Sequence, residues 1–142
     1  MMHRAVFDTN VVVSGFLSPS GPPGRLVEWL RNGAVQAVVD DRIMAEYAEV
    51  LVRPVFRLPV AEVEHVLATL RARPFWVEVA ANHLVQDLPD ADDAPFLECA
   101  LAAGVPLVTG NLRHFPKSAT KNITVVTPAE FISLIRGQPE GL

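Results

Sequence analysis

The stretch that decides the fold is R-A-V-F-D-T-N, residues 4–10. Apart from Arg4, residues 4–7 are apolar and partly β-branched, which is typical of a buried strand. Asp8, Thr9 and Asn10 follow at once, and residues of these types begin helices or turns. Four apolar residues then follow at helical spacing: Val12, Val13, Phe16 and Leu17. The Ser, Pro and Gly residues of 18–24 end this pattern. The stretch therefore predicts a strand followed directly by a short helix.

The alternation of strand and helix patterns continues along the chain. Apolar runs predict further strands at 35–39, 75–79, 105–108 and 123–126. Apolar residues at helical spacing predict further helices at 26–30, 42–53, 60–73, 96–103 and 128–135. This order favours an α/β fold, a three-layer α/β/α sandwich with a mostly parallel central sheet and helices on both faces. We expect a single domain over residues 1–136 and a flexible C-terminal tail over 137–142.

Length and composition narrow the class of protein. The chain has 142 residues, of which 50% are hydrophobic and 20% charged, as expected for one globular domain. Its formal net charge of -4 excludes a protein that grips a nucleic-acid duplex across a broad basic face. The single cysteine, Cys99, excludes an internal disulfide framework and a cysteine-rich zinc site. We find no secretory signal pattern and no apolar run of the ~20 residues that a membrane span needs, so we expect a cytoplasmic protein.

Charged residues are unevenly distributed in the second half of the chain. No lysine or arginine lies between Arg73 and Arg113, a segment that contains six acidic residues: Glu78, Asp87, Asp90, Asp92, Asp93 and Glu98. No acidic residue lies from 99 to 129, where Arg113, Lys117 and Lys121 carry positive charge beside His114. An acidic segment is thus followed directly by a basic one.

Acidic and polar residues also follow the predicted strands, at the edge where parallel sheets bind ligands. Asp8 follows the first strand, Glu46 lies on the helix after the second, and T-G-N at 109–111 follows the strand at 105–108. Carboxylates that converge there repel one another unless a cation neutralises them, and their oxygens suit Mg²⁺ or Mn²⁺. Such ions activate water for attack on phosphorus, while basic residues at the rim hold flanking phosphates. The pattern is typical of a phosphodiesterase.

Each of these residues also has a purely structural interpretation. Asp8 or Thr9 can cap the helix that follows. One of Asp92 and Asp93 can cap the helix predicted at 96–103 or interact with its positive N-terminus. Glu46 fits a solvated helix face. The basic residues and His114 fit an ordinary solvated surface.

Over nearly its whole length the chain resembles the PIN domains, specifically the VapC-like toxin ribonucleases of bacterial and archaeal toxin-antitoxin pairs. Four segments carry this resemblance. V-F-D-T-N-V-V-V-S-G-F (6–16) resembles the family's first strand with its metal-binding aspartate. I-M-A-E-Y-A-E-V-L-V-R-P (43–54) is similar to the helix whose glutamate points into the site. D-A-D-D-A-P-F-L-E-C-A-L (90–101) resembles the family's acidic helix entry, and L-V-T-G-N-L-R-H-F (107–115) resembles the strand and turn that close the pocket.

The resemblance implies a metal-dependent endoribonuclease that hydrolyses RNA phosphodiester bonds with a metal-activated water, using one or two Mg²⁺ or Mn²⁺ ions. It implies catalytic roles for Asp8, Glu46, Asp93 and Asn111. The expected metal ligands are Asp8, Glu46 rather than Glu49, Asp93 and Asp92, with Asp90 as a further helper. We expect Thr9, Asn10 and Thr109 to shape the pocket, and Arg113, His114 and Lys117 to contact the RNA backbone. Implied partners are RNA, a small antitoxin whose tail inserts basic or blocking groups at the acidic cleft, and a second copy of the chain; no membrane is implied.

Asn111 departs from the family pattern, because many PIN nucleases carry a fourth aspartate there or a few residues later. Its side chain still offers a carbonyl oxygen to a metal or a water. The departure leaves open a second hypothesis, a PIN scaffold that binds RNA or a protein without cutting. A third hypothesis is phosphoryl chemistry with Asp8 as nucleophile. A phosphatase would then need an aspartate at Asn10, and a phosphate receiver would need a lysine near Val126-Thr127-Pro128.

Overall fold

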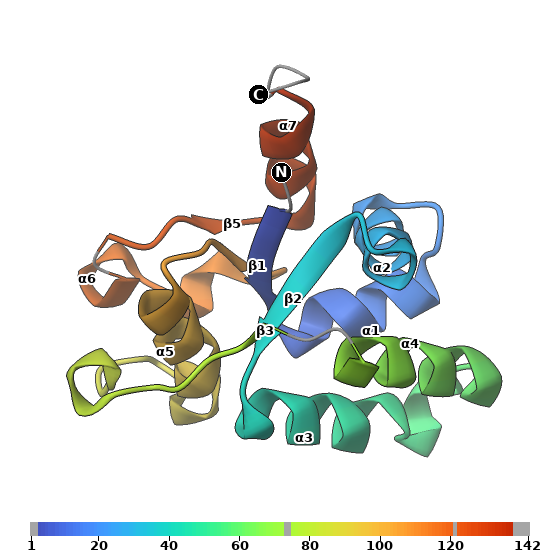
Figure 1. Ribbon diagram of the computed structural model, residues 1–142, viewed down its shortest axis with the longest axis horizontal. Helices are drawn as coiled ribbons and strands as arrows, with labels where there is room; N and C mark the ends of the chain where they lie inside the picture. Colours follow the sequence, from blue (N-terminus) through green and yellow to red (C-terminus); the bar gives the residue numbers. More distant parts are fainter. Residues whose placement is uncertain (1–2, 73–74, 121, 138–142) are drawn as a thin grey trace.

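The computed structural model describes residues 3–72, 75–120 and 122–137. Its centre is a five-stranded parallel sheet with the strand order β3-β2-β1-β4-β5 (Figure 1). The strands are β1 (His3–Phe7), β2 (Val35–Val39), β3 (Phe75–Trp76), β4 (Leu107–Val108) and β5 (Val125–Val126). The predicted α/β fold with a mostly parallel sheet is confirmed.

The central strand β1 fixes the position of its two neighbours. Ala5 lies opposite Ala37 of β2, and Val6 lies opposite Leu107 of β4. The last three residues of β1, Ala5 to Phe7, are completely buried. Helices cover both faces of the sheet, so side chains on both sides of this strand must be apolar. Residues 5–7 therefore form the middle of the core, and Asp8 follows directly at the carboxyl end of this strand.

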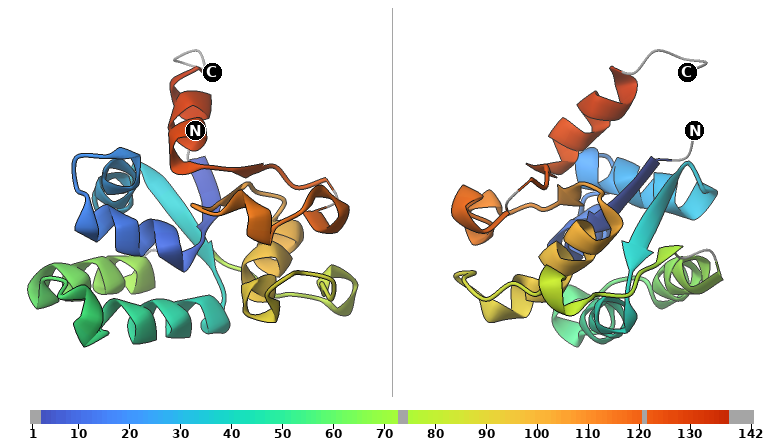
Figure 2. Two further views of the ribbon diagram at one scale, coloured as in Figure 1. Left: turned by 180° about the vertical axis from the view of Figure 1, so that it is seen from behind. Right: turned by 60° about the vertical axis from the view of Figure 1, so that its left-hand side comes forward.

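The helices of the described residues form the outer layers. They are α1 (Thr9–Leu17), α2 (Pro22–Asn32), α3 (Asp41–Leu51), α4 (Val60–Ala72), α5 (Ala94–Ala103), α6 (Lys117–Thr120) and α7 (Pro128–Arg136). Helices α1 and α2 lie on one side of β1 and β2, and α5 lies on the other (Figures 1 and 2). Helix α7 packs on β1, where the rings of Phe7 and Phe131 meet edge to face with centroids 5.8 Å apart. None of the helices described is long and apolar enough to cross a membrane.

Two glycines allow α2 to pack closely: Gly15 lets it pack against α1, and Gly24 against the loop that joins the two helices. A Cβ atom on Gly15 would lie 2.3 Å from Cγ2 of Val27, and one on Gly24 would lie 2.1 Å from the carbonyl oxygen of Pro19. Both distances are far below van der Waals contact, so neither position has room for a side chain. This packing holds α1, and with it the segment that follows Asp8, firmly against the rest of the domain.

Several predicted boundaries are wrong. The strand predicted at 75–79 ends at Trp76, the one at 105–108 spans only Leu107–Val108, and the one at 123–126 spans only Val125–Val126. The flanking residues are apolar because they pack against the core as loop, as Val77 and Ile123 do. The apolar pattern thus reports burial and not strand pairing. The four-residue helix α6 was not predicted because it is too short to show a helical period.

Two predictions reach beyond the described residues. Helix α4 is described as far as Ala72, and Arg73 of the predicted helix at 60–73 lies outside the described residues. Gly137 follows the last turn of α7, and the remainder of the predicted tail, 138–142, lies outside them as well.

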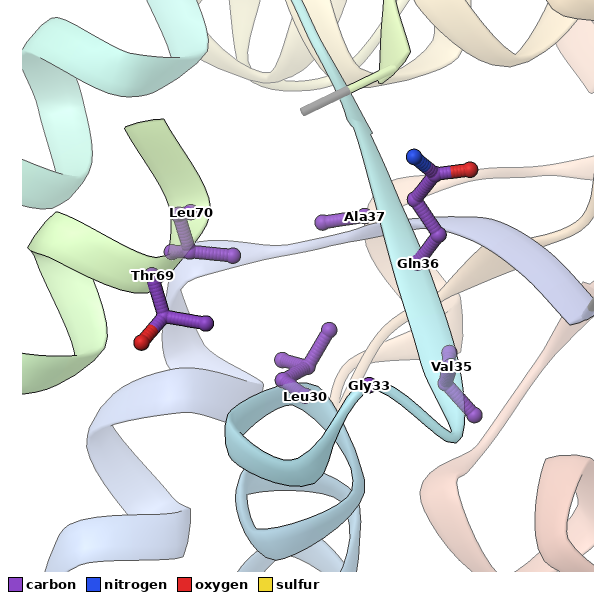
Figure 3. A pocket seen from close by; sticks show the side chains of 7 residues that line it. All are labelled: Leu30, Gly33, Val35, Gln36, Ala37, Thr69 and Leu70. Atoms are coloured by element: carbon purple, nitrogen blue, oxygen red, sulfur yellow. The ribbon is translucent and has the colours of Figure 1, made fainter. Parts of the chain in front are cut away.

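A small cavity of about 60 Å³ lies between the end of α2, the start of β2 and α4 (Figure 3). Leu30, Ala37 and Leu70 make its lining mainly apolar. Val35, which also lines it, is the first residue of β2. The cavity therefore lies at the amino end of the strands, away from the edge where parallel sheets bind ligands.

Candidate metal centre

Asp8 follows the last residue of β1 and is only 5% exposed. Its backbone amide donates to the carbonyl of Val108 at 2.9 Å, so the end of β1 is tied to the end of β4. Thr109, the residue after β4, donates its hydroxyl to Oδ2 of Asp8 at 2.8 Å. Two parallel strands therefore deliver a carboxylate and its hydrogen-bond donor to the same point of the sheet edge.

Glu46 reaches the same edge from α3. Its carboxylate accepts a hydrogen bond from the hydroxyl of Thr9, the first residue of α1. The next residue, Tyr47, is completely buried and donates its hydroxyl to the carbonyl oxygen of Phe7, directly before Asp8. Two successive side chains of α3 thus form hydrogen bonds with the residues on either side of Asp8. Glu49 instead pairs with Arg53 on the outer surface, with 2.7 Å between Oε2 and a guanidinium nitrogen.

Asp93 lies at the start of α5 and joins the cluster from the other side of the sheet. Its Oδ2 is 2.8 Å from Nδ1 of His114, a residue of the short 3₁₀ turn Leu112–His114 that follows β4. Ligand atoms of Asp90, Asp93 and His114 all lie within 4.8 Å of one another. Asp92 is exposed and lies outside this group, although its charge reaches Glu46 and raises the pKa of that carboxyl.

The three predicted acidic ligands influence one another electrostatically. The pKa of Asp8 is raised mainly by burial and also by the negative charge of Asp93, whereas the hydrogen bond from Thr109 lowers it. Burial also raises the pKa of Glu46, with an added contribution from Asp8. The pKa of Asp93 is raised by burial and by Glu46, although His114 opposes the shift. Of the described lysines and arginines, none forms a salt bridge with any of these three carboxylates. Burial and mutual repulsion thus disfavour their charged forms unless a cation is bound.

Helix capping does not account for these acids. Asp8 and Asp93 occupy the N-cap positions of α1 and α5, yet neither side chain makes a capping hydrogen bond. The amide of Asn10 lies close enough to lower the pKa of Asp8, but the bond that fixes the carboxylate comes from Thr109 on another strand. By contrast, Asp40 does cap α3, because its side chain accepts from the amide of Ile43 at 3.0 Å.

Hydrogen bonds hold the loop of residues 109–111 next to Asp8 and α1. Asn10 accepts a hydrogen bond from the amide of Gly110 at 3.0 Å, which links α1 to this loop. The amide of Asn111 donates to the hydroxyl of Thr109 at 3.1 Å. Thr9, Asn10 and Thr109 therefore each form a hydrogen bond with an acidic residue or with the loop beside them.

Comparisons with known proteins identify the family of the chain. The family model of the PIN domain matches residues 4–113. The chain belongs to the PIN-domain family. PIN domains are generally nucleases, which places the protein among the hydrolases at a coarse level. An uncharacterized protein of Methanocaldococcus jannaschii is 26% identical over 138 residues, which cover 91% of this chain and 89% of the relative.

A solved structure shares the fold of this PIN domain. It is the crystal structure of VapBC2 from Rickettsia felis bound to a DNA fragment from their promoter. The match has a TM-score of 0.55 and 16% sequence identity, and it covers 89% of this chain and 98% of the matched chain. This likeness supports the three-layer architecture predicted from the sequence.

The basic residues that follow β4 in this PIN domain differ in their contacts. Arg113 and Lys117 are exposed and form no salt bridge within the described part of the chain. His114 is instead turned toward Asp93. Lys121 lies outside the described residues. Among the described residues of this basic segment, Arg113 and Lys117 therefore present their charges to solvent.

Sequence reasoning missed three residues that support the centre. In the helix predicted at 42–53, Tyr47 counts among the apolar residues at helical spacing, and only the fold shows that its hydroxyl donates to the carbonyl of Phe7. Arg42 and Glu98 form a salt bridge of 2.7 Å between α3 and α5, the helices that carry or follow Glu46 and Asp93. These two residues are 56 positions apart, so no local pattern could have paired them.

Proposed function

We propose that this PIN domain is a metal-dependent endoribonuclease that hydrolyses RNA phosphodiester bonds. The observation that carries the proposal is the convergence of Asp8, Glu46 and Asp93, whose pKa values are all raised and which have no lysine or arginine partner among the described residues. Membership of a family whose domains are generally nucleases supports the same reaction class.

The donor atoms at this edge fit a hard divalent cation. Carboxylate oxygens of Asp8, Glu46 and Asp93 and the amide oxygen of Asn111 are of the type that Mg²⁺ and Mn²⁺ prefer. A bound cation would also relieve the repulsion that raises the three pKa values. When bound, such an ion supplies a water of lowered pKa and stabilises negative charge on the phosphate during attack.

The chain's own residues hold these donors in place and bind the substrate. The Thr109 hydroxyl fixes one oxygen of Asp8, and the Thr9 hydroxyl fixes one oxygen of Glu46, so the remaining oxygens are free to face a ligand. We assign Arg113 and Lys117, which are both exposed, to neutralise the backbone phosphates that flank the cut bond. We retain Asn111 as a catalytic helper and Asp92 as an accessory metal ligand.

The proposed partners follow from the charge of the same surface. An antitoxin segment that carries Lys or Arg could neutralise the acidic cluster and block it. The matched VapBC2 structure is a complex that is bound to promoter DNA, which supports a toxin-antitoxin assignment for a chain of this fold. We further propose that two copies of the chain can associate, and that the protein acts in the cytoplasm.

The first test is cleavage of single-stranded and hairpin RNAs by purified protein with Mg²⁺, Mn²⁺ or EDTA. We expect cutting that requires a divalent ion and that the Asp93→Asn variant loses. The Asp87→Asn variant is the matched control, because Asp87 is an exposed loop carboxylate. Full cleavage by Asp93→Asn, or equal cleavage in EDTA, would exclude this site and this mechanism.

Asn111 favours a second candidate function, a scaffold that binds RNA or a protein without cutting. It stands where many PIN nucleases carry an acid, so the site has one negative charge fewer. Calorimetric titration with Mn²⁺ separates the nuclease from the scaffold. A scaffold without a metal site should show no Mn²⁺ binding that depends on Asp8. Binding that Asp8→Ala abolishes would count against this alternative.

A further inference from the structure

His114 adds a nitrogen donor to a cluster that is otherwise built from oxygen atoms. The 3₁₀ turn Leu112–His114 directs its imidazole toward Asp93, and Nδ1 lies 2.8 Å from Oδ2 of that residue. Asp90 contributes the third ligand atom of a group whose members all lie within 4.8 Å. One oxygen of Asp90 accepts from the amide of Asp92 at 2.9 Å, which orients this carboxylate.

The separation of the two nearest donors suits shared coordination of one ion. Atoms that bind the same ion at right angles, each at about 2.1 Å, lie about 3 Å apart. Nδ1 of His114 and Oδ2 of Asp93 are 2.8 Å apart. An ion can therefore replace the proton between them after only a small movement of either side chain.

We infer that His114 is a metal ligand, together with Asp93 and Asp90, and that it makes this centre favour Mn²⁺ over Mg²⁺. The inference rests on the proposed function, because Asp93 is shared with the proposed nuclease site. Mg²⁺ is bound mainly by carboxylate oxygens and water, whereas imidazole suits first-row transition ions. His114 thus supplies a nitrogen donor beside the oxygen donors of Asp93 and Asp90.

Pulsed electron paramagnetic resonance of bound Mn²⁺ tests this ligand directly. The sample is the full chain, free of any affinity tag, with less than one equivalent of Mn²⁺. We expect a coupling between the ion and a ¹⁴N nucleus, and we expect His114→Gln to lose it. His65→Gln is the matched control, because His65 is exposed on α4, and it should keep the coupling.

Calorimetry of the same proteins measures the ion preference. We expect His114→Gln to weaken Mn²⁺ binding by about tenfold or more and to change Mg²⁺ binding by less than about threefold. Circular dichroism establishes that the variant is folded. The shorter variant His114→Ala repeats the test in case glutamine itself binds the ion through its amide oxygen.

The outcomes separate this inference from the proposed function. If Mn²⁺ binds in an Asp93-dependent way and RNA is cut, but no ¹⁴N coupling is seen, His114 is only a hydrogen-bond partner and the inference fails alone. If the coupling is present and depends on His114 but no RNA is cut with any ion, the inference stands and the nuclease proposal fails. If no ion binds through Asp93, both fail.

Discussion

Replacing Asp8 with asparagine should stabilise the metal-free protein. Asp8 is 5% exposed, and its pKa is raised by burial and by the neighbouring charge of Asp93. Asparagine has almost the same shape, and its side-chain oxygen can still accept the 2.8 Å hydrogen bond from Thr109. The substitution therefore removes an unfavourable buried charge and keeps the hydrogen bond that fixes the side chain.

The expected gain is about 1 kcal/mol in the free energy of unfolding, within the range of about 0.5–2 kcal/mol that relief of a strained functional site commonly gives. For a domain of this length, 1 kcal/mol corresponds to a rise in melting temperature of about 4 °C. Mn²⁺ at one hundred times its dissociation constant should stabilise the wild type by about 2.7 kcal/mol, or roughly 10 °C. Asp8→Asn should show little of this second effect.

Thermal and urea unfolding followed by circular dichroism, in EDTA and in Mn²⁺, measures both effects. The exposed Asp87→Asn variant is the control and should behave as the wild type in both buffers. If Asp8→Asn is less stable than the wild type in EDTA, the carboxylate is a structural group and the argument from uncompensated charge is wrong. Equal stabilisation of both proteins by Mn²⁺ would remove Asp8 from the ion site.

The same variant makes a prediction for pH. Because the pKa of Asp8 is raised above the ordinary value of 3.8 in the folded state, the folded wild type binds this proton more tightly than the unfolded chain does. In EDTA the wild type should therefore gain stability relative to Asp8→Asn as the pH falls from 7 through the raised pKa. The advantage of the variant is largest at neutral pH and disappears below the ordinary value. A difference between the two proteins that stays constant across this range would contradict the linkage.

The remaining predictions concern the residues that support the centre. Tyr47→Phe leaves the buried carbonyl of Phe7 without its donor, so we expect a loss of about 1–3 kcal/mol in urea unfolding and weaker Mn²⁺ binding in calorimetry. Glu98→Gln removes the charge that pairs with Arg42, and we expect a loss of about 1–2 kcal/mol, fully reported by a lower urea midpoint at unchanged m-value. Gly24→Ala places a methyl group 2.1 Å from the carbonyl oxygen of Pro19, and thermal unfolding should show a loss of at least about 2 kcal/mol. No loss would mean that the loop at Pro19 can move away from α2 at little cost.

The sequence predicts the order of elements well because burial follows apolar pattern closely in this chain. Residues 4–7 and 35–39 read as strands, and both lie in the centre of the sheet. The outer strands β3 and β5 are only two residues long, and the apolar residues beside them pack as loop. A periodicity rule detects buried residues but not ladder pairing, so it overestimates these strands.

The candidate site was predictable only in part. The place of Asp8 follows from a strand end, because parallel strands bring their carboxyl ends to one edge. The roles of Glu46, in the middle of α3, and of Asp93, directly before α5, were instead implied by the resemblance to PIN domains. The side chains that orient them come from distant parts of the chain. Thr109 is 101 residues from Asp8, and Thr9 is 37 residues from Glu46. Those pairings depend on the register of β1 against β4 and on where α3 lies, which no local pattern contains.

Two buried acids of this chain show why burial alone does not mark a functional site. Glu98 is 4% exposed, and its two oxygens accept from the guanidinium of Arg42 at 2.7 Å and from the amide of Val85 at 3.0 Å. Its negative charge has an internal counter-charge, so the chain itself completes the interaction. Asp8 is equally buried, but its donor is a neutral hydroxyl and its nearest charged neighbours include another acid.

The same chemical change should therefore have opposite effects at these two positions. Replacing the carboxylate of Glu98 with an amide breaks its charge pair with Arg42 and costs stability in any buffer, because Arg42 then keeps only Asp40 as a charged partner. At Asp8 it removes a repulsion and costs only the binding of an external cation. If both variants were destabilised equally in EDTA, Asp8 would belong with Glu98 among the structural acids, and the case for a cation at this sheet edge would lose its physical basis.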